Sequence, residues 1–207
     1  MSQVQRLVPK QARSRELVDR ILTAAGELFA GRGFPDTTTN LIAERAGVSI
    51  GSLYQFFADK EEILAALQDK WTARLGAELD ERLQVDAVVD FAATVDHVLD
   101  VHDTLNRQPP GLLGFLLIST VDNGRSDGVS EAIRRRLVDM LAFGAPTLSP
   151  QRRKVVAGML VHISNGLYTV GRTAGATDPA VRAEVREALL SYLTPILRDP
   201  SADIGRP

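Results

Sequence analysis

The side chains best suited to bind another molecule lie in the run VSIGSLYQFFADK, residues 48–60. Helical spacing turns Leu53 and either Phe56 or Phe57 inward and leaves an outer face without charge, which is unusual for a helix face in water. The outer face comprises Ser49, Ile50, Gly51, Ser52, Tyr54 and Gln55. Glycine in a helix costs about 1 kcal/mol relative to alanine, so Gly51 suggests that another molecule approaches the backbone there.

This outer face matches the chemistry of the major groove of DNA. Gln55 could pair with an adenine edge, and Ile50 could contact a thymine methyl group. Ser49 and Tyr54 can donate hydrogen bonds to phosphates, as can the amide groups at helix N-termini. We therefore predict that residues 49–57 form a recognition helix.

Hydroxyl and basic side chains on either side could hold phosphates. Thr39 and Lys60 stand at the starts of the neighbouring predicted helices, while Lys10, Arg13 and Arg15 precede the first helix as a basic arm. Residues 1–60 contain eight basic and six acidic side chains, whereas the rest of the chain contains 16 and 20. This asymmetry favours a DNA-binding N-terminus, although each residue alone could have a structural role, such as helix capping by Thr39.

Apolar spacing predicts the helices that would position these groups. The first helix is expected to begin with Ser14 as its N-cap and to end at GRGF, residues 31–34. One of residues 37–39 should cap a second helix that closes at Gly47. A connection of three residues, with Ser49 as the next N-cap, then leads to the recognition helix, and this arrangement is the sequence form of a helix-turn-helix. Asp59, with Glu62 three residues on, makes a capping-box-like start of the following helix.

The remainder of the chain also shows helical spacing, and no strand-like alternation is evident in the first 80 residues. Helical stripes cover residues 62–75, 85–101, 111–120, 133–141, 155–170 and 181–197. The predicted fold class is all-α, with a three-helix N-terminal DNA-binding domain and a larger helical body. The predicted boundaries are a basic arm at 1–13, a helix-turn-helix domain at 14–60, a ligand-binding and dimerisation domain at 61–198 and a tail at 199–207.

The run ILTAAGELFAGRGFPDTTTNLIAERAGVSIGSLYQFFADKEEIL resembles the DNA-binding domain of TetR-family transcriptional regulators. The resemblance covers about residues 14–65. Its pieces are the Ala-Ala and Leu-Phe pairs of the first helix, Gly33-Phe34, paired threonines, Ile42-Ala43, Ala46-Gly47-Val48-Ser49, Gly51, Leu53-Tyr54, Phe57 and Lys60. Phe56 stands where the family usually has tyrosine or histidine. The resemblance implies DNA contacts at Thr39, Ser49, Ile50, Gly51, Ser52, Tyr54, Gln55, Phe56 and Lys60.

The resemblance also implies a homodimer, which would read a palindromic operator, double-stranded DNA with two half-sites about one helical turn apart. The last two helices of such proteins pair with their twofold mates in a four-helix bundle. The expected interface residues are Val155, Gly158, Met159, Val185, Leu189 and Tyr192.

A small-molecule effector, largely apolar, is expected to bind in the body and to release the operator. The candidate lining residues are Phe91, Phe115, Phe143, His162, Asn165 and Tyr168. Three of them, at positions 162, 165 and 168, share one face of a helix, so they could line a pocket or form a satisfied core network. The resemblance thus implies a ligand-responsive repressor.

Several other classes of protein are disfavoured. The chain has no cysteine, and it contains no phosphate-binding glycine loop, G-x-S-x-G motif or HExxH motif, so we expect no enzyme and no cofactor. His97 and His102 are five residues apart, on different helix faces, so no metal site is expected. No apolar run approaches about 20 residues and no secretory signal is evident, which favours a cytoplasmic protein.

One alternative is a helical protein–protein adaptor whose helix-turn-helix is no longer used. The uncharged outer face of the recognition helix disfavours it, because a disused surface would tend to gather ordinary charged side chains.

Overall fold

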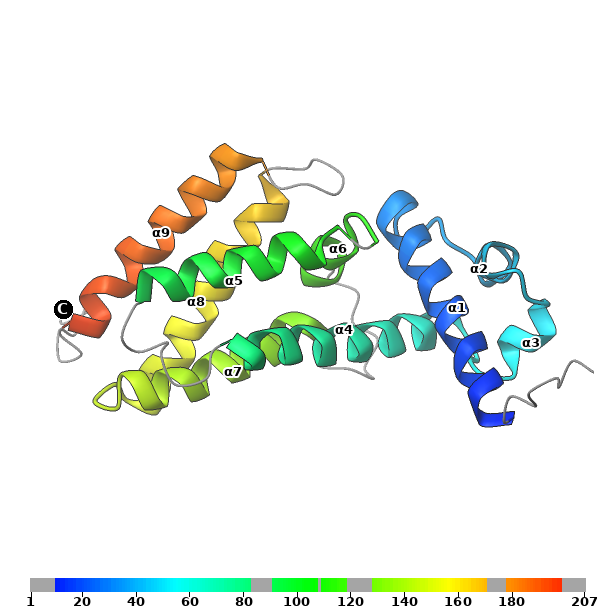
Figure 1. Ribbon diagram of the computed structural model, residues 1–207, viewed down its shortest axis with the longest axis horizontal. Helices are drawn as coiled ribbons and strands as arrows, with labels where there is room; N and C mark the ends of the chain where they lie inside the picture. Colours follow the sequence, from blue (N-terminus) through cyan, green and yellow to red (C-terminus); the bar gives the residue numbers. More distant parts are fainter. Residues whose placement is uncertain (1–9, 83–90, 108, 119–127, 171–177, 199–207) are drawn as a thin grey trace, which may run out of the picture. The chain divides into compact units, whose positions relative to one another are not determined.

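The computed structural model describes residues 10–82, 91–107, 109–118, 128–170 and 178–198 (Figure 1). Within these ranges the regular elements are helices, apart from one isolated β-bridge, so the predicted all-α class is confirmed. The helices are α1 (Lys10–Arg32), α2 (Thr39–Ala46), α3 (Ile50–Tyr54), α4 (Lys60–Arg82), α5 (Phe91–Leu105), α6 (Leu112–Ile118), α7 (Gly128–Gly144), α8 (Pro150–Thr169) and α9 (Pro179–Arg198). The chain forms two compact units, the head (residues 1–67) and the body (residues 68–207), and their boundary falls within α4.

The head is built around the apolar face of α1. This helix packs against α2, and α2 packs against α3. Their shared core contains Ile21, Leu22, Ala25, Phe29, Ile42, Ala46, Leu53, Phe57, Ile63 and Leu64. Burying a large apolar side chain contributes about 1.5–3 kcal/mol, so this core holds together helices that are too short to be stable alone.

The N-terminal part of the head differs from the sequence prediction. Helix α1 starts at Lys10, so Ser14 lies inside the helix and is not its N-cap. Arg13 and Arg15 accordingly belong to α1 rather than to a preceding arm, and both are exposed. The residues between Lys10 and Ser14, Gln-Ala-Arg, are good helix formers, which allows the helix to extend toward the N-terminus. Residues 1–9 of the predicted arm lie outside the described residues.

The body is a bundle in which α8 packs against both α7 and α9. Helix α6 packs against α7 and α8, and α5 packs against α9. The predicted stripes at 155–170 and 181–197 lie mainly on α8 and α9. The first six residues of the stripe predicted at 85–101 lie outside the described residues, and the rest lies on α5.

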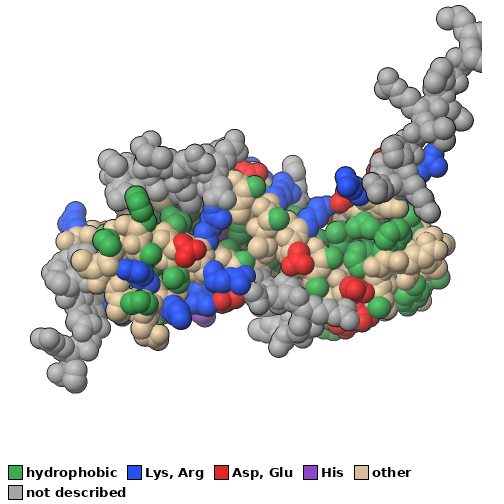
Figure 2. All heavy atoms as spheres, turned by 90° about the horizontal axis from the view of Figure 1, so that it is seen from below, with side chains coloured by type: hydrophobic (Ala, Val, Ile, Leu, Met, Phe, Trp, Pro, Cys, Tyr) green, Lys and Arg blue, Asp and Glu red, His purple; other side chains and the backbone are tan. Residues whose placement is uncertain are grey.

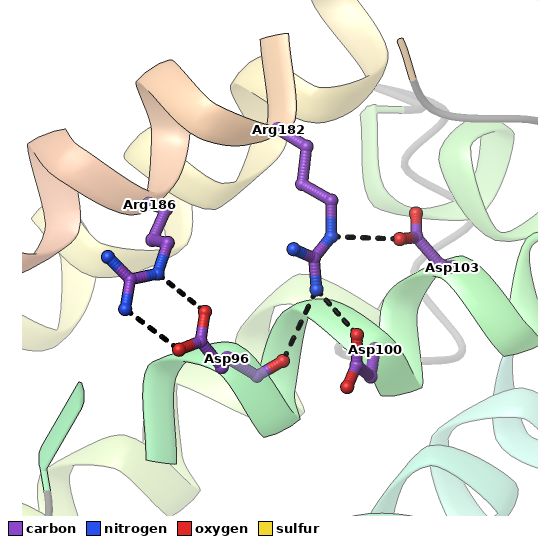
Figure 3. Close-up of polar contacts among 5 residues, drawn as sticks. All are labelled: Asp96, Asp100, Asp103, Arg182 and Arg186. Carbon is purple, nitrogen blue, oxygen red and sulfur yellow. Dashed lines mark hydrogen bonds and ion pairs between the residues drawn. The ribbon is translucent and has the colours of Figure 1, made fainter. Parts of the chain in front are cut away.

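Charged side chains join α5 to α9 (Figure 3). Arg186 donates from Nε and Nη2 to the two carboxylate oxygens of Asp96, at 2.6 and 2.8 Å. Arg182 bonds Asp103 at 3.0 Å and Asp100 at 2.5 Å. The hydrogen bonds from Arg186 lower the pKa of the Asp96 carboxyl, and partial burial opposes them. The two arginines therefore bind a row of three carboxylates on one face of α5 and offset two of the three charges.

Arg182→Met should lower the free energy of unfolding of the body by about 1–2 kcal/mol, because two carboxylates would lose their charged hydrogen-bond donor. Urea unfolding measures this change. The matched control is Arg134→Met, which removes an arginine paired within α7 to Glu131 and should have little effect. Equal effects of the two substitutions would contradict a special role for the α5–α9 charges.

Candidate nucleic-acid interface

The turn between α2 and α3 is closed by a left-handed glycine. Gly47 has φ +64°, a conformation that side chains other than glycine and asparagine rarely adopt. Its N–H donates to the Glu44 carbonyl at 3.1 Å, and the N–H of Val48 donates to the Ala43 carbonyl at 3.0 Å. This paired pattern is a Schellman motif, and it confirms the predicted C-terminal glycine of the second helix.

Helix α3 is shorter than the predicted recognition helix and ends at Tyr54. Ser49 caps it as predicted, since its Oγ accepts the Ser52 N–H at 3.0 Å and lies 2.8 Å from the Ser52 hydroxyl. On the inner side Leu53 and Phe57 are buried, which decides between the two predicted phenylalanines; Phe56 is only half-buried. The caps and the inner side chains therefore set the direction in which α3 faces.

The outer face of α3 remains open to solvent. Ile50 is 37% exposed and Tyr54 is 52% exposed, and Gln55 is exposed as well. The Tyr54 hydroxyl forms a hydrogen bond of 3.1 Å with Thr39 Oγ1, which joins the outer faces of α2 and α3. Figure 2 shows apolar side chains gathered on one face of the head. The predicted contact residues of α2 and α3 thus share one accessible surface.

Gly51 has no packing reason to be glycine. A Cβ atom there would meet nothing closer than Ser49 Oγ at 4.0 Å. Gly114 of α6 is different, because its Cβ would lie 2.7 Å from Cδ1 of Tyr168. The interior of the protein therefore requires a glycine at position 114 but not at position 51.

Contacts anchor α2 at both of its ends. Thr38, and not Thr39, is the N-cap, and its Oγ1 accepts the Leu41 N–H at 3.3 Å. Thr39 is consequently the first helical residue, with its hydroxyl available to Tyr54. Arg45, near the end of α2, forms an ion pair with Glu27 of α1 at 2.7 Å.

The basic residues predicted to contact DNA differ in their exposure and in their partners within the protein. Arg13 and Arg15 are exposed on α1, and the side chain of Lys10 lies outside the described part of the chain. Lys60 begins α4, and its ammonium donates to backbone carbonyls of residues 34–37, which connect α1 to α2. The structure therefore gives Lys60 partners within the head.

The candidate effector residues do not converge on one interior site. Tyr168 is buried, whereas Phe143 is 79% exposed. His162 is exposed too, and its Nδ1 donates to the Gly158 carbonyl one turn earlier. The face that residues 162, 165 and 168 were predicted to share is thus divided between solvent and core, because α8 turns only its inner side toward α6. Phe115 and Asn165 are half-buried, and the Phe91 side chain lies outside the described residues.

A buried polar cluster was missed in the sequence. His102 of α5 and Tyr168 of α8 are both buried, with a 2.9 Å hydrogen bond between His102 Nδ1 and the Tyr168 hydroxyl. Asn106 is also buried, and its Oδ1 accepts the Gly114 N–H at 3.2 Å. Burial lowers the pKa of His102 from 6.5 to about 4, although the Asp103 charge opposes the shift. His102 and Asn106 carry no local signal, since their partners are distant in sequence.

The predicted dimer residues fall into two groups. On α8, Val155 is 45% exposed and Met159 is 44% exposed, and a Cβ at Gly158 would meet nothing within 4 Å. On α9, Val185 and Leu189 are buried within the protomer, which leaves little of them to contact a partner. Helix α9 packs against α8, and a Cβ atom added at Gly166 of α8 would lie 3.3 Å from Cγ2 of Val185. Tyr192 is half-buried.

No three His, Asp or Glu side chains among the described residues lie together so that they could hold a metal ion. No helix in the described part of the chain combines the length and apolar character of a membrane span.

Two family models match the chain. The model described as bacterial regulatory proteins of the tetR family matches residues 21–67, and the model described as a tetracyclin repressor-like C-terminal domain matches residues 90–193. The first match contains α2, α3 and most of α1, and the second contains most of the body. The matched families are those of regulators, not of enzymes.

Individual relatives agree with these matches. The HTH-type transcriptional regulator BetI of Burkholderia cenocepacia is 34% identical over 177 residues, 80% of this chain and 85% of that protein. The HTH-type transcriptional repressor KstR of Mycobacterium tuberculosis is 26% identical over 183 residues, 85% of this chain and 81% of the repressor. A solved TetR-family regulator from Streptomyces coelicolor is 29% identical, with a TM-score of 0.67 over 89% of this chain and 99% of that chain.

Gly51→Ala should separate stability from DNA binding. The new methyl group lies in open space, so the free energy of unfolding should stay constant or rise by up to about 1 kcal/mol. Affinity for duplex DNA should fall at least about tenfold, since the methyl group would hold α3 off the groove. Gly31→Ala on α1, where a Cβ also meets nothing within 4 Å, is the control and should bind as the wild type does. Fluorescence anisotropy measures binding, and unchanged affinity of Gly51→Ala would contradict close approach at this position.

The buried histidine should make stability depend on pH. Because the folded pKa of His102 is about 4 and the ordinary value is 6.5, the unfolded chain binds more protons between these pH values. The free energy of unfolding should therefore fall by up to about 3 kcal/mol as pH drops from 6.5 to 4. His102→Gln should remove the contribution of this one titrating group to the pH dependence of the free energy of unfolding. Urea unfolding of both proteins at several pH values measures the difference, and parallel curves would contradict the assignment.

Proposed function

The chain belongs to the TetR family of bacterial regulatory proteins, and from this premise we propose that it is a ligand-responsive homodimeric repressor that binds a palindromic operator. Family membership makes it a DNA-binding transcriptional regulator. The observation that carries the finer proposal is the outer face of α3, which is uncharged, exposed and free of side-chain bulk at Gly51. A protein acting on chromosomal DNA works in the cytoplasm.

In this proposal α3 enters the major groove. Ile50 and Gln55 face the bases, while Ser49, Ser52 and Tyr54 contact the edges of the groove and the phosphates. Gly51 allows the backbone to approach. The hydrogen bond between Tyr54 and Thr39 supports the assignment, because it aligns a hydroxyl from each helix on the same side. The remaining expected contacts are Thr39, Lys10, Arg13, Arg15, Phe56 and Lys60, of which Lys60 has hydrogen-bond partners within the head.

The homodimer would use the exposed side of α8. Val155 and Met159 are one turn apart and both exposed, with Gly158 beside them, so they form an apolar stripe that permits close helix approach. Tyr192 of α9 is the remaining candidate with partial exposure. A twofold partner at this stripe would supply the second head that a palindromic operator requires.

The proposed control of transcription is repression that a small-molecule effector relieves. The relative KstR is a transcriptional repressor, which supports repression over activation in this chain as well. The effector would be largely apolar, since the body's interior consists mainly of leucine, valine and isoleucine, with His102 and Tyr168 as buried polar groups. Helix α4 runs from the head into the body and would carry the signal. A coupling free energy of about 1–3 kcal/mol suffices, because 1.4 kcal/mol changes affinity tenfold.

Selection of bound duplexes from a random DNA pool by the purified protein tests the proposal. A palindromic motif with half-sites about one helical turn apart is the expected result. Gln55→Ala should then weaken binding by about 1–3 kcal/mol and relax the preference at one base pair in each half-site. Arg45→Ala, which removes the exposed pair with Glu27, is the control and should leave base preference unchanged. A folded, dimeric protein that enriches no sequence would contradict the repressor and favour a protein–protein adaptor.

A further inference from the structure

The ammonium group of Lys60 is enclosed by the connection between α1 and α2. Its Nζ donates to the carbonyl oxygens of Phe34 at 2.9 Å, Thr37 at 3.1 Å and Pro35 at 3.4 Å. It also lies 4.4 Å from the centroid of the Phe34 ring, within the range of a cation–π interaction. An ammonium group has three donors and no acceptor, so these carbonyls occupy its full hydrogen-bonding capacity.

The connection that Lys60 binds is ordered by its own contacts. Gly33 ends α1 with φ +86°, and its N–H donates to the Phe29 carbonyl at 3.0 Å. The fully buried Thr37 donates its hydroxyl to the Gly33 carbonyl at 2.8 Å. The carbonyls of Phe34, Pro35 and Thr37 lie outside any helix, and the lysine ammonium donates to all three, although the Phe34 carbonyl also accepts the Thr37 N–H at 3.3 Å.

The start of α4, where Lys60 stands, is held equally firmly. Asp59 Oδ1 accepts the Glu62 N–H at 2.7 Å, and Glu62 Oε2 accepts the Ala58 N–H at 2.6 Å, a variant of the capping box. Lys60 therefore links two locally fixed segments, the first turn of α4 and the residues that lead directly into Thr38, the N-cap of α2.

We propose that Lys60 is a positioning residue, which sets the first turn of α2 against α4, and not itself a phosphate ligand. It acts through Thr39, the residue after the Thr38 cap. The Thr39 hydroxyl forms a hydrogen bond with Tyr54 on the side that faces the operator in the proposed complex. A phosphate could gain this ammonium only by breaking three hydrogen bonds within the head. The inference rests on the proposed operator binding, and it makes Lys60 the point where movement of the first turn of α4 reaches the α2 contacts.

The salt dependence of operator binding distinguishes a positioning residue from a phosphate ligand. Each phosphate contact contributes about 0.9 to the slope of log affinity against log salt. Lys60→Met should weaken binding of the selected palindromic duplex about tenfold at every salt concentration, with the slope unchanged. A slope reduced by about 0.9 per head, with affinities that converge at high salt, would overturn the proposal. Lys70→Met on the same helix is the control for net charge and should bind as the wild type does.

A double-mutant cycle with Thr39→Ala tests the route of action. If Lys60 acts through Thr39, then Thr39→Ala should cost much less affinity in the Lys60→Met protein than in the wild type. Additive losses would mean that Lys60 does not act through Thr39. A loss of thermal stability alone, with operator affinity and slope both unchanged, would likewise overturn the positioning role.

The native protein offers a measurement that needs no variant, and its first part needs no DNA. In the nitrogen-15 spectrum of lysine ammonium groups, Lys60 should exchange its hydrogens slowly in the free protein, and its shift should change little when the duplex is added. Rapid exchange in the free protein, with protection only in the complex, would overturn the proposal. The free-protein result holds even if no operator is found. Failure of the positioning role of Lys60 and failure of the proposed function are therefore distinguishable.

Discussion

Helix α3 has five residues, too few to be stable by itself, and the binding surface depends on what holds it in place. Three constraints suffice: the left-handed turn at Gly47, the Ser49 cap and the burial of Leu53. Because these constraints all act on the inner side or at the ends of the helix, the outer side needs only the hydrogen bond between Tyr54 and Thr39. Small, uncharged residues can therefore occupy the rest of the outer side, which faces the groove in the proposed complex.

The body is held together differently. Where α5 meets α9, two arginines form ion pairs with three carboxylates, and where α5 meets α8, a histidine and a tyrosine form a hydrogen bond in the core. The buried pair of His102 and Tyr168 adds little net stability, but it penalises alternative packings, because each group left unpaired would cost more than the bond contributes.

Helix α4 is the element shared by the head and the body. Its first residue, Lys60, binds the carbonyls before α2, and its later turns belong to the body. Under the proposals above, control of the operator contacts by a ligand would need no long chain of side-chain contacts within the head. A displacement of the first turn of α4 would act on α2 through Lys60, and α2 is joined to α3 by Thr39 and Tyr54.

The sequence by itself determined the all-α class, the helix-turn-helix and the caps at Gly47, Ser49 and Asp59, because periodicity and capping are local properties that neighbouring residues encode. Tertiary structure alone decided which side of each helix is covered. It buried Val185 and Leu189 within the protomer, left Phe143 in solvent and paired His102 with Tyr168. It also turned the Lys60 ammonium toward carbonyls more than 20 residues away. Such contacts depend on the packing of distant segments, which no local pattern records.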